Sequence, residues 1–140
     1  MSRNGVNTLV GSVFGAVYVA VGLVGFAITG SVEFAGEHGE KLLGLFEVNP
    51  LHNVVHIAIG VLLFAASRKG ERPAAAVNAL VGSVYLLVGV VGLFVLDASA
   101  NILALNGFDN LLHLASAGLL LAVGASGLRT VGTPVADARP

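Results

Sequence analysis

The sequence contains no cysteine or tryptophan and very few charged residues. Without cysteine there are no disulfides, thiolate metal sites or thiol nucleophiles, so any metal must be held by His, Asp, Glu or backbone oxygen. Only 11% of the 140 residues are charged, against about 25% in soluble domains. The net charge is −1, and the lack of an extended basic patch argues against nucleic acid as a partner. The remaining environment for so apolar a chain is the lipid bilayer.

Long runs of apolar residues make up most of the sequence. Each is close to the roughly 20 residues that a helix needs to cross a bilayer, and none contains Lys or Arg. A β-barrel would show short segments of alternating polarity instead. We therefore predict an all-α integral membrane protein, one domain over residues 1–140, built as a four-helix bundle. The predicted spans run from Thr8 to Thr29, Pro50 to Ser67, Pro73 to Leu96 and Gly107 to Leu128.

The distribution of basic residues predicts the orientation. If the helices alternate in direction, Lys41 is the only basic residue on one side of the membrane. By the positive-inside rule the other side is cytoplasmic. Both termini then lie inside, residues 129–140 form a cytoplasmic tail, and the loop 30–48 is an outer interfacial loop or a lid. The predicted cytoplasmic basic residues are Arg3, Arg68, Lys69, Arg72, Arg129 and Arg139.

The sequence is internally repeated. NTLVGSV at 7–13 recurs as NALVGSV at 78–84, and YVAVGLVG at 18–25 recurs as YLLVGVVG at 85–92. Repeat 1 covers about 7–67 and repeat 2 about 78–128. Because each unit crosses the membrane twice, we expect a parallel repeat of two helix hairpins. The glycines in the spans favour tight packing within the bundle, although a homo-oligomer or a larger membrane complex stays open.

A polar phrase opens the second and fourth spans: NPLHNVVH at 49–56 and NGFDNLLH at 106–113. Asn49 and Asn106 are expected to cap these helices. One turn further in, Asn53 and Asn110 share a helix face with the histidines that end each phrase, and lipid offers such groups no partner. We therefore expect a polar site near the outer ends of these two helices.

Several uses of this cluster stay open. The favoured interpretation is structural: the Asn and His side chains bond one another, and the protein has a structural or accessory role without catalytic residues. The alternative is a divalent metal such as zinc, supported by Asn53 and Asn110 as hydrogen-bonding partners of the ligands. The expected metal ligands are His52, His56, Asp109 and His113.

Two further hypotheses have less support. A haem held between His56 and His113 as axial ligands would use their matched positions. The other hypothesis is a polar path for protons or a small solute. The inner halves of the two helices contain only Ser67, Ser116 and Ser126 as polar residues, too few for a path across the membrane. Tyr18 and Tyr85 are interpreted as packing residues.

The LLGLF run at 42–46, the phrase VNPLHNVVHIAIG at 48–60 and a second Asn-x-x-x-Asn-x-x-His at 106–113 resemble a bacterial family of small four-helix membrane proteins of unknown function. The resemblance covers nearly the whole chain. It implies a multipass protein of the bacterial plasma membrane and supplies no reaction, substrate or ligand.

Overall fold

The computed structural model describes residues 5–132, and in this range the chain forms four α-helices. Each of them is long and apolar enough to cross a membrane. This confirms the predicted all-α, four-helix membrane fold. Arg3, Arg139 and the tail beyond residue 132 lie outside the described residues. The helices are α1 (Val6–Phe26), α2 (Pro50–Lys69), α3 (Glu71–Val95) and α4 (Gly107–Gly132).

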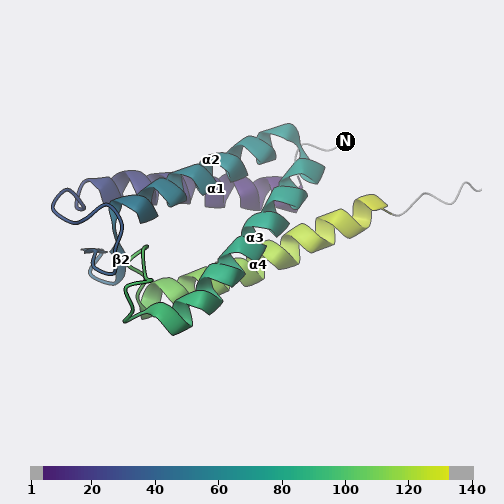
Figure 1. Ribbon diagram of the computed structural model, residues 1–140. Helices are drawn as coiled ribbons and strands as arrows, with labels where there is room; N and C mark the ends of the chain where they lie inside the picture. The colour runs from purple at the N-terminus through teal and green to yellow at the C-terminus, as the bar shows by residue number, and fades with distance from the viewer. Residues whose placement is uncertain (1–4, 133–140) are drawn as a thin grey trace, which may run out of the picture.

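The helices form two hairpins, α1 with α2 and α3 with α4, and contacts of α3 with α1 and α2 join them (Figure 1). At one end α2 passes into α3 through Gly70, whose φ of 116° suits a residue without a Cβ. We call this the turn end. The opposite end carries the two long connections, residues 27–49 and 96–106, and we call it the loop end. Both Asn/His phrases begin at the loop end.

Most helix boundaries differ from the predicted ones by one to four residues; α1, for example, covers Val6–Phe26 instead of Thr8 to Thr29. α3 begins at Glu71 rather than Pro73, because a proline in the first helical turn removes an N–H that has no intrahelical partner anyway. α4 runs on to Gly132 instead of ending at Leu128. Arg129, assigned from the sequence to a tail, is therefore still helical.

The loop end contains a small β-hairpin that the sequence did not predict. Strand β1 (Glu40–Leu42) pairs antiparallel with β2 (Phe46–Val48), and the connection uses positive φ at Leu43 and Gly44. The two long connections also touch, because the Gly36 N–H donates to the Ile102 carbonyl. What was expected to be an interfacial loop or lid is thus a hydrogen-bonded cover over the ends of α2 and α4.

The buried core lies where the four helices meet. It contains, among others, Tyr18 of α1, Leu63 of α2, Tyr85 of α3 and Leu120 of α4. α1 and α2 approach closely at Gly15, where an added Cβ would lie 2.7 Å from the Gly60 carbonyl oxygen. The glycine at this position therefore serves packing within the bundle, as expected. Large apolar side chains cover the outside of the helices, as a lipid-facing surface requires.

Candidate metal centre

Asn49 fixes the start of α2 and attaches it to both long connections. Its Oδ1 accepts the His52 N–H at 2.9 Å, which confirms the predicted N-cap. Its Nδ2 donates to the carbonyls of Gly36 and Ile102, at 3.1 and 2.9 Å. All of these partners are backbone groups, so Asn49 has a structural role.

Asn106 and Asp109 together fix the start of α4, because the side chain of each accepts the backbone N–H of the other. The Asn106 Oδ1 accepts the Asp109 N–H, and the Asp109 Oδ2 accepts the Asn106 N–H, both at 3.0 Å. This is the geometry of a capping box. The same Asp109 oxygen also accepts the Glu47 N–H from β2 at 3.0 Å. Asp109, expected as a metal ligand, is instead engaged with backbone and lies outside the cluster of histidines described below.

Asn53 and Asn110 pack against glycines of the partner helix in their own hairpins. A Cβ added at Gly25 would collide with the Asn53 carboxamide, and one added at Gly92 with that of Asn110. The Asn53 Nδ2 donates to the Thr29 hydroxyl at 3.1 Å. In the second repeat Leu96 stands where Thr29 stands in the first. Within the described range, both polar side-chain atoms of Asn110 are accordingly without a hydrogen-bond partner.

The three remaining residues of the predicted site, His52, His56 and His113, come together in the interior. One ring nitrogen from each lies within 4.8 Å of those of the other two. Their exposed fractions are 2%, 8% and 5%. Ring centroids are 4.4 Å apart for His52 and His56, 5.7 Å for His52 and His113, and 6.2 Å for His56 and His113. α2 supplies two of the rings and α4 the third.

Tyr18 and Tyr85 enclose this cluster from the side of the bundle core. Tyr18 stacks on His56 with an interplanar angle of 7°, and Tyr85 lies against His113 at a centroid distance of 5.1 Å. The two tyrosine rings also meet edge-on, 5.4 Å apart. Both tyrosines are predicted to be packing residues, and their place beside the histidines is not evident from the sequence. Their matching positions in the two repeats were the signal available.

The buried histidine nitrogens are poorly satisfied by protein. Nδ1 of His56 and Nδ1 of His113 have no hydrogen-bond partner among residues 5–132, and the His52 nitrogens approach only the backbone of Leu103 and Glu47, without a hydrogen bond of normal geometry. Roughly 90% or more of buried polar groups in proteins have one, and an unpaired group costs about 1–3 kcal/mol. The expectation that the Asn and His side chains bond one another therefore holds for none of these nitrogens.

The donor set fits a metal ion better than it fits a haem. Zinc takes imidazole nitrogens at about 2.0–2.1 Å, which places the ligand atoms of a tetrahedral site about 3.4 Å apart. The ligand nitrogens now lie within 4.8 Å of one another, so ring rotations that move each nitrogen by about 1 Å would bring them to that spacing. A haem between His56 and His113 would need the space between them, and the His52 ring, close to both, fills it.

The turn end holds a second buried polar cluster with a different character. The Glu71 carboxylate accepts the backbone N–H groups of Asn7 and Thr8 at 2.9 and 3.1 Å, so it caps α1 from α3. The Asn78 Nδ2 donates to the Asn7 carbonyl at 3.1 Å and to its Oδ1 at 3.0 Å. The internal repeat shows that Asn7 and Asn78 correspond, but it does not predict that the two residues meet.

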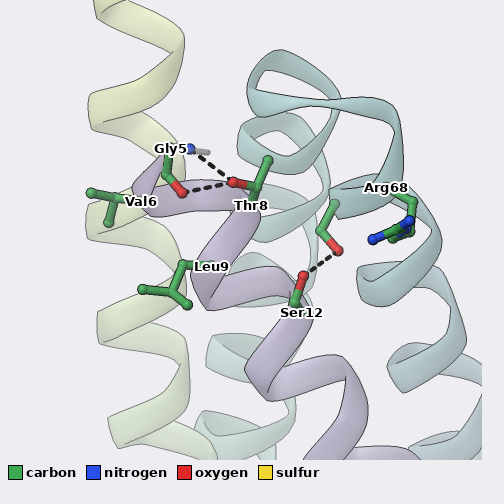
Figure 2. Close-up of a pocket in the computed structure, with 7 residues that line it drawn as sticks. Gly5, Val6, Thr8, Leu9, Ser12 and Arg68 are labelled. Atoms are coloured by element: carbon green, nitrogen blue, oxygen red, sulfur yellow. Dashed lines mark hydrogen bonds between the residues drawn. The ribbon is translucent and has the colours of Figure 1, made fainter. Parts of the chain in front are cut away.

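A pocket at this end runs along the start of α1, and its polar groups bond one another (Figure 2). The Thr8 hydroxyl donates to the Gly5 carbonyl at 2.7 Å and accepts the Gly5 N–H at 2.9 Å. The Ser12 hydroxyl donates to that of Ser67 on α2 at 2.9 Å, and Arg68 lies beside them. The pocket contains none of the buried histidines.

Four apolar helices with a buried polar interior define a multipass membrane protein of the four-helix class. Residues 9–126 match the family described as a domain of unknown function, DUF4383, and the chain belongs to that family. This confirms the expected membership of a family of unknown function. No curated protein and no solved structure matches the chain.

Proposed function

We propose that this membrane protein binds a divalent transition metal through His52, His56 and His113. The observation that carries the proposal is the convergence of three buried imidazoles, four of whose nitrogens make no hydrogen bond of normal geometry with the described part of the protein. Neutral imidazole is the commonest metal ligand, and it suits zinc, copper and nickel. With three protein ligands a fourth position stays open, an arrangement typical of functional rather than purely structural zinc sites.

The surroundings support a pre-organised site. The caps at Asn49 and Asn106 fix the starts of α2 and α4, and all three histidines project from the first two turns of these helices. The stacked Tyr18 ring and the Tyr85 ring restrict the orientations of His56 and His113. A ligand set held in this way loses less conformational freedom when the ion binds.

We also infer the orientation in the bacterial plasma membrane from charge. Arg68, Lys69, Arg72 and Arg129 lie at the turn end, whereas Glu33, Glu37, Glu40, Glu47 and Asp97 lie at the loop end. The positive-inside rule supports a cytoplasmic turn end with both termini inside, and a metal site near the outer surface. Labelling of a cysteine introduced at Lys69 by an impermeant reagent in intact cells would contradict this orientation.

Metal content tests the central proposal. Protein purified in detergent and dialysed against zinc is expected to retain about one ion per chain, and the variant with His52, His56 and His113 all replaced by Ala is expected to retain none. His38→Ala is the matched control, because the His38 side chain is 89% exposed and belongs to the cover of the loop end. Equal zinc content in the triple variant and the wild type contradicts the proposal.

A structural role without a ligand is the second candidate. Its support is that Asn49, Asn106 and Asp109 all bond backbone groups of the connecting segments, as parts of a scaffold do. Under this proposal the histidines fill space only. If the purified protein binds zinc, copper or nickel at none of its histidines, the result supports the structural role and excludes the metal site.

A further inference from the structure

A pocket of about 280 Å³ lies between α1 and α4 and reaches the histidine cluster from the side of the bundle. Its outer walls are apolar and include Val17 and Val21 of α1 and Leu112 of α4. His56, His113 and Ser116 also line it. Val17 and Leu112 are 50% and 46% exposed on the outer helix surface, which in a membrane faces hydrocarbon. The pocket therefore connects the buried imidazoles with the lipid.

The route from the aqueous phase at the loop end is covered. Above His52, the hydrogen bonds of Asn49 hold the two long connections together. Val48, Asn49 and Ala104 in this cover are each no more than 1% exposed. A molecule that approaches the histidines in this structure without opening the cover must come through the apolar pocket.

We propose that the pocket admits the head of a long-chain fatty acid from the bilayer, and that its carboxylate takes the open position on the metal. This inference rests on the proposed metal site. Three neutral imidazoles leave the charge of a buried divalent ion uncompensated, and a buried charge is costly unless it is paired. Asp109, the nearest acid in the sequence, is committed to backbone N–H groups. An incoming anionic ligand supplies the missing charge.

The pocket matches both parts of such a molecule. Carboxylate oxygen is a regular zinc ligand at about 2.0–2.2 Å, and the hydroxyls of Tyr18 and Ser116, which both line the pocket, offer donors to the second oxygen. The valine and leucine walls suit the first methylenes of an acyl chain, whose remainder stays in the hydrocarbon. An ion with a water shell would not cross these walls, so the metal itself loads by another route.

Cobalt-substituted protein in phosphatidylcholine nanodiscs provides the test, because the visible absorption of cobalt reports its ligands. Oleate is expected to shift the cobalt band, while acetate and oleyl alcohol at the same concentration leave it unchanged. Val17→Trp, which fills the pocket, is expected to raise the oleate concentration for half-maximal shift at least tenfold with cobalt content unchanged. Leu112→Trp tests the opposite wall, and Val91→Trp, on the exposed face of α3, is the matched control.

The outcomes separate the two proposals. Cobalt bound in full with no response to oleate overturns the fatty-acid inference and leaves the metal site standing. If acetate shifts the cobalt band as much as oleate does, the ligand arrives from water, and the inference is overturned. An equal shift with oleyl alcohol, which lacks the carboxylate, also overturns it. Absence of bound cobalt overturns the metal proposal itself.

Discussion

The turn end and the loop end both bury polar side chains between helices, but they use them differently. At the turn end Glu71, Asn7, Thr8 and Asn78 bond one another or the backbone across α1 and α3. At the loop end the three histidines are as deeply buried and make contact mainly through their ring faces. Burial of polar groups alone therefore does not mark a binding site in this bundle. Among the residues that the structure describes, the turn end has one such buried atom without a hydrogen bond, Asn78 Oδ1, whereas the three histidines together have four. Under the proposed function, this concentration of unpaired nitrogens distinguishes the loop end.

The same distinction divides the Asn/His phrase itself. Asn49 and Asn106, at the helix starts, serve helix capping and the closure of the loop end. The histidines one and two turns further in have no such task. Under the proposed function, one motif thus combines a scaffold at its start with metal ligands at its end, and the predictions below test that division.

The largest expected effect is stabilisation by metal at the loop end. Zinc at 100 times its Kd should raise the free energy of unfolding by about 2.7 kcal/mol, because the unfolded chain lacks the converged histidines. Thermal unfolding in detergent, followed by circular dichroism, measures the change in Tm. Magnesium, which prefers oxygen ligands, serves as the control, and an equal rise in the triple histidine variant would contradict the assignment.

At the turn end, Asn78→Leu should destabilise the protein by about 1–3 kcal/mol, because it removes two hydrogen bonds and leaves the Asn7 side-chain oxygen unpaired. Chemical unfolding in mixed micelles measures the loss. Ser83→Ala is a suitable control, since that hydroxyl bonds only the Ala79 carbonyl on the exposed face of its own helix. A loss no greater than that of the control would show that this polar pair stabilises nothing.

The two asparagines that pack on glycine should differ by about 1 kcal/mol. Asn53→Ala removes the hydrogen bond to Thr29, whereas Asn110→Ala removes a side chain without a partner among residues 5–132. Both leave similar cavities beside a glycine, so the comparison isolates the hydrogen bond. Thr29→Val should abolish the difference, and a greater loss from Asn110→Ala than from Asn53→Ala would contradict the assignment.

The smallest effect is expected for a histidine in metal-free protein. His113→Leu should change the free energy of unfolding by less than about 1 kcal/mol, since replacing an unpaired buried polar group by an apolar one of similar size is nearly neutral. The measurement uses protein stripped with a chelator. A loss as large as that of Asn78→Leu would mean that His113 has a structural partner, and the two ends of the molecule would then be alike.

Local features made much of this architecture predictable. The lengths of the apolar runs define the four helices, and Asn49 before Pro50 marks the start of α2. The structure brings His52, His56 and His113 together, as the sequence predicts, since their spacing places them on facing helix turns. Asp109 does not join them, because the carboxylate at the third helical position bonds its own cap, a competition that residue type alone does not decide.

Features that depend on contacts distant in sequence escaped prediction. Each strand of the β-hairpin is three residues long, too short for an alternating pattern. The capping of α1 by Glu71 joins residues 64 positions apart. The lateral pocket depends on how loosely α1 and α4 approach each other, which the spans do not reveal.

X-ray absorption at the zinc edge tests the central claim most directly, because it counts the atoms around the ion in the purified, zinc-loaded protein. The proposed site predicts three imidazole nitrogens at about 2.0–2.1 Å and a fourth ligand atom that is oxygen, with the imidazole signal lost when His52, His56 and His113 are replaced. A first shell made only of oxygen, as at a surface carboxylate, or an unchanged imidazole signal in the triple variant, would contradict it.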